Sequence, residues 1–290
     1  MSTPPFLGLP ATALAETWQT SRGPRRVLHI GVDSAADWAV LVPGFTGSKE
    51  DFIALLQPLL DAGFAVVTFD QLGQYESAGS SVESDYALDA LAADLHEIVA
   101  LARQRRPRHE PPHLLGHSFG GLVSQVALAS PEFEVASWVG LCTGPGALPS
   151  HRHGPLPALI DALPQTPLAD LWDVKRALER SAGQADPPLE VEEFCRNRWL
   201  ANHPIGLRSK AVLLCDQPSV ISGPAARAQL PKAVVYGELD DAWPISIQQA
   251  MAIDIGADCF VIPQGGHSPN ADAPTATSAL LAGWWRQARG

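Results

Sequence analysis

The chain has 290 residues, of which 46% are hydrophobic and 18% charged, an ordinary composition for a soluble globular enzyme with a substantial buried core. Its formal net charge of -11 argues against nucleic acid or an anionic membrane surface as a partner, because both are polyanions. The chain opens without the basic stretch and apolar core of a signal peptide, no run of about 18 apolar residues follows, and the four cysteines are widely spaced. We therefore predict a cytoplasmic protein with reduced thiols.

The first half of the chain alternates between apolar runs and helical patterns. Ser48 precedes one helical pattern and Asp51 follows three residues later, which predicts a capping box at the start of that helix. The predicted strands lie around residues 17–19, 26–31, 38–42, 64–69, 113–115 and 135–141, and the predicted helices run from Ser48 to Gly63, from 86 to 104 and from 118 to 129. This order predicts an α/β fold with a mostly parallel sheet flanked by helices.

The pattern changes in residues 147–225, where helical stretches alternate with proline-rich joints and no convincing strand occurs. The helical stretches cover 168–179, 191–203 and 207–215. Alternation then resumes with strands at 232–236 and 259–262 and helices at 245–255 and 275–289. We therefore predict one core formed by 1–146 and 226–290, and a helical cap formed by 147–225 over one end of the sheet.

The run from Gly116 to Gly120 reads Gly-His-Ser-Phe-Gly and lies between an expected strand and an expected helix. In that context a G-x-S-x-G pattern is typical of a nucleophile elbow, a sharp turn that projects the serine from the end of the sheet. Glycines on both sides permit the close backbone approach that such a turn needs. Ser118 is therefore the candidate nucleophile, although a plain glycine turn with a capping serine would give the same letters.

A serine hydroxyl needs a positioned base, and that base needs a carboxylate to orient it. His267 follows a predicted strand, in the loop Gln264–Asn270, which places it at the same sheet end as Ser118. The preceding strand leads into a turn with three carboxylates, Glu238, Asp240 and Asp241. From the residues alone, His267 could be an ordinary exposed loop histidine and the turn a solvated acidic loop.

The ordered set Gly44-Phe45, Ser118, Gly237-Glu238-Leu239-Asp240 and Gly266-His267 resembles the α/β-hydrolase superfamily, in its cap-bearing branch, from about residue 26 to the end. The resemblance implies the α/β-hydrolase fold. Because the family's acid is the fourth residue of a G-x-x-D turn, it also implies Asp240, rather than Asp241, as the third triad member. By position, the backbone N–H groups of Phe45 and Phe119 would form the oxyanion hole.

Two departures from the family pattern leave the subfamily open. Many relatives have His-Gly before the oxyanion residue, where this chain has Pro43-Gly44. Many also have D-x-R-G-x-G-x-S after the fourth strand, and here Leu72 and Tyr75 replace the arginine and the second glycine.

These features predict a serine hydrolase that cleaves a small, largely apolar carboxylic ester or thioester through an acyl-serine intermediate. We expect a small-molecule substrate and no cofactor or metal, and we leave the oligomeric state open. The same triad could instead serve C–C bond hydrolysis, an imino- or aminopeptidase, or cofactor-free perhydrolysis, and a ligand-binding receptor or catalytically silent scaffold could keep the same fold.

Several further residues have side chains that could bind a metal or a substrate. His151 and His153 have the spacing of metal ligands but no third ligand nearby, so we interpret them as solvated loop residues. Cys142 follows a strand near the expected site and is interpreted as a buried structural thiol. Three tryptophans could line an acyl pocket under the cap or equally belong to the core: Trp172, Trp199 and Trp243.

Overall fold

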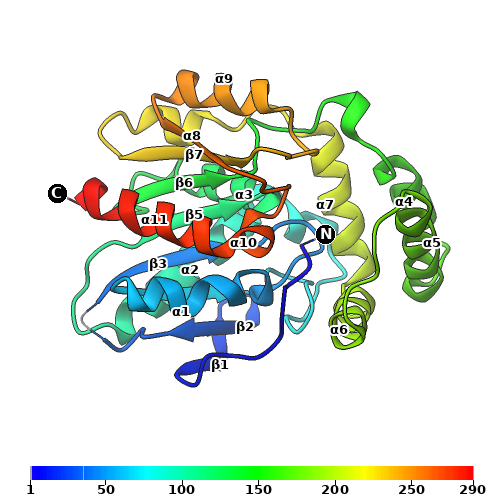
Figure 1. Ribbon diagram of the computed structural model, residues 1–290, viewed down its shortest axis with the longest axis horizontal. Helices are drawn as coiled ribbons and strands as arrows, with labels where there is room; N and C mark the ends of the chain where they lie inside the picture. The colour runs from blue at the N-terminus through cyan, green and yellow to red at the C-terminus, as the bar shows by residue number, and fades with distance from the viewer. Residues whose placement is uncertain (1, 35, 290) are drawn as a thin grey trace.

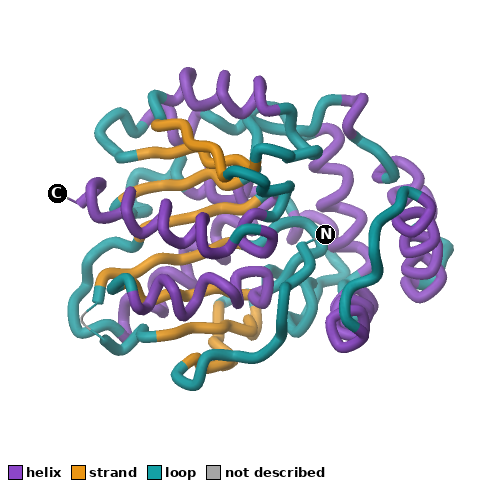
Figure 2. The backbone as a smooth tube through the Cα atoms, viewed as in Figure 1, coloured by secondary structure: helices purple, strands orange, loops and turns teal. Residues whose placement is uncertain are grey.

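The computed structural model describes residues 2–34 and 36–289, and these residues form one eight-stranded sheet with helices on both faces (Figures 1 and 2). The spatial order is β1-β2-β4-β3-β5-β6-β7-β8. The pairs β1–β2 and β2–β4 are antiparallel and all others are parallel, so the predicted fold class is confirmed. The strands are β1 (Ala13–Thr20), β2 (Gly23–Ile30), β3 (Asp37–Val42), β4 (Phe64–Phe69), β5 (His113–His117), β6 (Ser137–Leu141), β7 (Lys232–Gly237) and β8 (Asp258–Ile262).

The central strands are apolar on both faces because helices cover both sides of the sheet. All six residues of β4 and all five of β5 are buried. The parallel register aligns Val42 with Gly116 and Gly116 with Gly140, so β3, β5 and β6 end at the same edge. The segments that leave these strands are therefore neighbours, although the strands end at residues as distant in sequence as Val42 and Leu141.

The helices divide between the two faces of the sheet. In Figure 1, α1 and α11 lie in front of the sheet and contact each other, whereas α2 and α3 pack together behind it. The helices are α1 (Ile53–Asp61), α2 (Leu88–Arg105), α3 (Phe119–Ala127), α4 (Leu156–Ala162), α5 (Leu168–Ser181), α6 (Leu189–Leu200), α7 (Pro204–Asp216), α8 (Ser222–Ala226), α9 (Ile245–Ile255), α10 (Pro269–Asp272) and α11 (Pro274–Arg289), with short 3-10 turns η1 (Lys49–Phe52), η2 (Glu83–Tyr86) and η3 (Ser150–Arg152).

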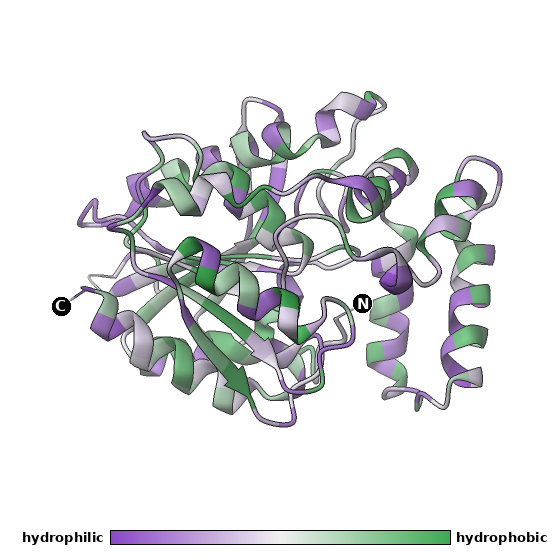
Figure 3. Ribbon diagram, turned by 90° about the horizontal axis from the view of Figure 1, so that it is seen from above, coloured by the Kyte–Doolittle hydropathy of each residue, from purple (hydrophilic) through white to green (hydrophobic). Residues whose placement is uncertain are grey.

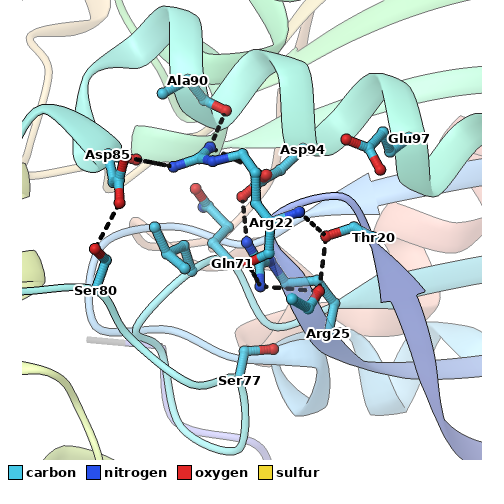
Figure 4. Close-up of polar contacts among 12 residues, drawn as sticks. Thr20, Arg22, Arg25, Gln71, Ser77, Ser80, Asp85, Ala90, Asp94 and Glu97 are labelled. Atoms are coloured by element: carbon cyan, nitrogen blue, oxygen red, sulfur yellow. Dashed lines mark hydrogen bonds and ion pairs between the residues drawn. The ribbon is translucent and has the colours of Figure 1, made fainter. Parts of the chain in front are cut away.

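The two strands of the opening hairpin, β1 and β2, have eight residues each and are longer than the strands predicted at 17–19 and 26–31. Charged side chains conceal the strand pattern in the sequence, and the structure pairs them. Arg25 lies buried with its Nη2 2.8 Å from Oδ2 of Asp94 in α2, and Arg22 Nη1 donates to Oδ1 of the same carboxylate at 3.0 Å. Figure 4 shows both guanidinium groups converging on Asp94, which fastens the hairpin to α2.

The predicted capping box at Ser48 is wrong. Ser48 makes no side-chain capping bond, and the chain forms the 3-10 turn η1 before α1 begins. Instead, Arg198 from α6 donates to the Ser48 hydroxyl at 3.3 Å and to Asp51 Oδ1 at 2.6 Å. A distant buried arginine thus occupies the two oxygens that a local helix cap would have used.

Five helices, α4–α8, separate β6 from β7 in the chain, and α4–α7 gather at one end of the sheet (Figure 1). Two of them, α4 and α8, were not predicted. Trp172, Trp199 and Leu207 belong to a small apolar cluster of their own, whereas Ala211 and Leu214 of α7 join the main core. The helix α7 therefore packs against both the small cluster and the main core. The boundaries of the cap at 147–225 stay a prediction. Within the described residues, no helix has the length and apolar character that crossing a membrane requires.

Candidate active site

Ser118 occupies the turn between β5 and α3 with φ 53° and ψ -122°. An L-residue in this left-handed conformation costs on the order of 1–3 kcal/mol, so the surrounding structure must impose it. The Ser118 N–H donates to the carbonyl of Leu141 at 3.0 Å, and its own carbonyl accepts from Thr143 Oγ1 at 2.8 Å. Both partners come from the end of β6, so the neighbouring strand fixes the strained turn.

The two glycines of the motif are required by close packing. A Cβ at Gly120 would lie 2.3 Å from the carbonyl oxygen of Val42, and one at Gly116 would lie 2.4 Å from Ser124 Oγ. Neither separation is possible for a real side chain, and at Gly120 the obstacle is backbone. The pattern G-x-S-x-G therefore reflects the approach of α3 to the ends of β3 and β5, which excludes a plain surface turn.

The structure brings Ser118, His267 and Asp240 into one hydrogen-bonded chain. His267 Nε2 lies 3.0 Å from Ser118 Oγ, and its Nδ1 lies 2.8 Å from Asp240 Oδ1. Asp241, the neighbouring candidate, has an exposed side chain, whereas Asp240 is only 8% exposed. The open question of which carboxylate faces the imidazole is answered geometrically in favour of Asp240.

The carboxylate of Asp240 is held in its charged form by its hydrogen bonds. Burial raises the pKa of this carboxyl, but the bond from His267, the Ala242 N–H at 3.0 Å and Gln248 Nε2 at 2.7 Å together outweigh it, and the net pKa lies below the usual value. An ionised Asp240 fixes the tautomer with the proton on Nδ1 of His267. Nε2 is then free to accept the Ser118 proton.

His117, the residue before the nucleophile, was not singled out in the sequence. Its Nε2 lies 2.8 Å from the carbonyl oxygen of His267, and burial, with the nearby His267, lowers the pKa of His117 to about 3. The ring is therefore neutral at pH 7 and donates its Nε2 proton to that carbonyl. It thereby ties the loop of the candidate base to the strand of the nucleophile.

Phe119 follows Ser118 and Phe45 lines the same cavity as Ser118, and among the described residues neither backbone N–H donates a hydrogen bond. Phe119 is the first residue of α3, where a helix leaves its N–H free. A Cβ on Gly44 would come within 3.0 Å of Ser118 Cβ, so only glycine lets the Phe45 segment approach so closely. The two donors predicted for an oxyanion hole thus lie beside the nucleophile.

Two glutamines brace the loop that carries Phe45. Gln71 Nε2 donates to the Pro43 carbonyl at 2.7 Å, and Gln74 Nε2 donates to the Gly44 carbonyl at 2.8 Å. Both glutamines are buried and lie in the segment where the chain departs from the family's D-x-R-G-x-G pattern. Two amide side chains support the loop here, which sequence comparison with that pattern could not predict.

A cavity of about 260 Å³ adjoins Ser118 and His267. Trp243 lines it, with its ring centroid 6.2 Å from that of His267. Trp172 and Trp199 are absent from its described lining and pack against each other in the cap cluster at 6.3 Å. Of the three tryptophans, only Trp243 is placed to contact a substrate beside Ser118.

The cap contributes cavity residues that the sequence did not identify. Apolar side chains from the cap segment face the cavity together with two polar ones, and these residues are Leu148, Leu156, Leu214, Arg152 and His153. His153 was expected to be a solvated loop residue, but it lies in the cavity wall with Nε2 2.9 Å from the Leu148 carbonyl.

Cys142 is fully buried behind the candidate triad, and burial raises the pKa of its thiol well above the usual value. Ligand atoms of Cys142, Asp240 and His267 lie within 4.8 Å of one another, which is close enough for a metal ion. Asp240 and His267 share a hydrogen bond at 2.8 Å, and the Cys142 thiol lies buried behind them.

Residues 39–280, more than four fifths of the chain, match the profile of the alpha/beta hydrolase family. The chain belongs to this family. The match includes every residue of the hydrogen-bonded chain described above, and both expected oxyanion donors. No curated protein sequence matches this alpha/beta hydrolase.

Many solved structures share the fold of this alpha/beta hydrolase at low sequence identity. An esterase from Exiguobacterium antarcticum is 18% identical with a TM-score of 0.76, covering 94% of this chain and 100% of its own. A carboxylesterase structure from Nitrososphaera gargenis is 17% identical with a TM-score of 0.73, and the match covers 98% of this chain and 98% of that one. A malate-bound esterase from Thermogutta terrifontis is 21% identical with a TM-score of 0.72, and the match covers 97% of this chain and 100% of that one. At these identities the similarity establishes the fold.

Proposed function

We propose that this alpha/beta hydrolase is a serine hydrolase that cleaves small, largely apolar carboxylic esters or thioesters through an acyl-serine intermediate. The observation that carries the proposal is the hydrogen-bonded chain from Ser118 through His267 to Asp240 beside a cavity. A serine in a strained turn, a base 3.0 Å from its hydroxyl and a buried orienting carboxylate are the parts that nucleophilic acyl transfer requires.

In the proposed reaction, Ser118 Oγ attacks the ester carbonyl while His267 Nε2 takes its proton. The negative charge that develops on the carbonyl oxygen is stabilised by the N–H groups of Phe45 and Phe119. The protonated His267 then gives its proton to the departing alcohol or thiol, which leaves an acyl-serine. Water, deprotonated by His267, attacks the acyl-serine and regenerates the free serine. Asp240 stabilises the imidazolium in both halves of the reaction.

The preference for an apolar acyl group rests on the cavity lining. Leu148, Leu156, Leu214 and Trp243 offer apolar surface, and burial of each methylene of a substrate contributes about 0.8 kcal/mol. The similarity to solved esterases supports the same class of substrate.

The test is hydrolysis of p-nitrophenyl acetate and butyrate, a thioester and an aminoacyl amide by the purified protein, with labelling of Ser118 by a fluorophosphonate. We expect the native protein to hydrolyse the esters and to be labelled. In Ser118→Ala labelling should be absent, and turnover should fall to at most about 10³–10⁴-fold above the uncatalysed rate. No turnover and no labelling would overturn the proposal. Ligand binding that persists in Ser118→Ala without any turnover in the native protein would identify a receptor instead.

A further inference from the structure

The segment Ser2–Leu9, here named the strap, runs along the seam between the sheet core and the cap helices. In Figure 1 the N-terminal segment leaves β1 and ends beside α10, close to α6 and α7, and Figure 3 shows the same end between the core and the outlying helices. Ser2 and Pro4 are buried, and Leu7 packs against the cap cluster. The strap is therefore anchored at these three residues, whereas Thr3 and Pro5 are exposed.

The first described residue of the strap is held by buried polar groups. Arg198 Nη2 donates to the Ser2 carbonyl at 2.5 Å, and the same guanidinium binds Asp51 Oδ1 through Nη1. Asn270 Nδ2 lies 3.5 Å from Ser2 Oγ and donates to the Asp51 carbonyl at 2.6 Å. Arg198 belongs to α6, Asp51 to η1 and Asn270 to α10, so the predicted cap, the core and the short helix after His267 all meet near Ser2.

Two cavities share His267 as a lining residue, and the strap contributes one residue to each of them. The cavity of about 260 Å³ is lined by Ser118, His267 and Ser2. A second cavity of about 490 Å³ is also lined by His267, together with Thr3 of the strap. Its lining combines an apolar part, Trp172, Ala185 and Pro187, with charged side chains, Lys175, Arg176, Glu179, Asp186, Glu192, Asp241 and Asp272. Consecutive residues of the strap thus face different cavities, while the candidate base faces both.

We infer that residues 2–5 form a wall that closes the acyl cavity against its larger neighbour and so sets the length of acyl chain that the enzyme accepts. The inference rests on the proposed esterase function. With the wall in place, the space beside Ser118 suits a short acyl group such as acetyl or butyryl. Without it, the two cavities join along His267, and a longer chain can extend from Ser118 along the apolar part of the second lining, at Trp172 and Pro187.

The experiment compares kcat/KM for p-nitrophenyl acetate, butyrate and octanoate in four proteins: the native chain, a deletion of residues 2–5, Ser2→Trp and Phe6→Ala. Phe6 also belongs to the strap, but its side chain is exposed, so Phe6→Ala is the matched control. Thermal unfolding and fluorophosphonate labelling of Ser118 show whether each variant is folded with an intact nucleophile.

A hydrophobic pocket discriminates by about 10–200-fold per methylene, which sets the size of the expected effects. We expect the deletion to raise the octanoate-to-acetate ratio of kcat/KM by about tenfold or more, because the wall is gone. Ser2→Trp should lower the butyrate-to-acetate ratio by about tenfold, since the indole fills the cavity, and Phe6→Ala should leave the native profile.

A folded deletion variant that keeps the native preference for acyl-chain length would contradict the inference that residues 2–5 close the cavity. An unchanged butyrate-to-acetate ratio in Ser2→Trp would contradict it as well. If the deletion variant does not fold, the Ser2→Trp ratio decides by itself. If the native protein neither hydrolyses any of the esters nor labels at Ser118, the proposed function fails, and that outcome is distinct from a native esterase whose profile ignores the strap.

Discussion

At the scale of single residues, the site depends on which of two adjacent carboxylates faces the imidazole. Asp240 is buried and accepts three hydrogen bonds, whereas the side chain of Asp241 is exposed and its backbone carbonyl accepts a hydrogen bond from Arg152. Two neighbouring residues of the same type thus lie in different environments because the turn directs their side chains apart.

Replacing Asp240 with asparagine keeps the shape but allows His267 to present its proton to Ser118 instead of accepting one. We expect kcat for p-nitrophenyl butyrate to fall by about 10⁴-fold in Asp240→Asn. Asp241→Asn is the matched control and should retain native turnover. Steady-state kinetics of both variants provide the check, and equal losses in the two would show that the assignment of the acid is wrong.

At the scale of secondary-structure elements, buried ion pairs fasten peripheral elements to the sheet core. Arg25 and Asp94 join the opening hairpin to α2, and Arg198 and Asp51 join α6 to η1. Each pair is almost fully excluded from solvent. Removing one member of such a pair leaves the other charged and buried, which is far more costly than losing a surface ion pair.

We therefore expect Asp94→Ala to lower the free energy of unfolding by about 3–5 kcal/mol, because Arg25 and Arg22 lose their common carboxylate. Glu134→Ala is the control: Glu134 pairs with Arg103 at 2.9 Å at the surface, and its loss should cost about 0–1 kcal/mol. Urea denaturation of both variants measures the difference. A loss of less than about 1 kcal/mol in Asp94→Ala would contradict the anchoring role of the pair.

At the scale of the whole molecule, burial of neutral histidines couples folding to pH. His29, His113 and His117 are each at most 2% exposed, and burial lowers the pKa of all three. Below pH about 6.5 the unfolded chain binds protons that these folded histidines do not take up. Stability is therefore fully present above that pH and decreases as the pH falls, for His117 down to about pH 3.

His117→Gln tests this linkage, since the amide can still donate to the His267 carbonyl but does not titrate. Each proton bound only by the unfolded state changes the free energy of unfolding by about 1.4 kcal/mol per pH unit. Between pH 6 and pH 5 we expect the variant to lose stability less steeply than the native protein, by up to about that amount. Denaturant titrations across this range provide the measurement, and identical slopes would show that His117 is not linked to unfolding.

The sequence by itself determined the features that depend on local pattern and chain order. Continuous apolar runs predicted the central strands, and glycines at 116 and 120 predicted the sharp turn that carries Ser118. The order of strand ends predicted that Ser118, the acidic turn and His267 meet at one edge, because parallel strands end together. All of this follows from short-range sterics and from the periodicity of buried elements.

Tertiary structure decided what depends on contacts between distant segments. Ser48 and Asp51 have the letters of a helix cap, yet Arg198, about 150 residues away, binds them both. The three candidate tryptophans separated into one beside His267 and two inside the predicted cap, which no local pattern distinguishes. The position of Ser2 in the lining of the cavity at Ser118 likewise depends on how the α6 segment packs against the core. Such choices follow from which buried polar groups find partners, and only the packed chain brings those partners together.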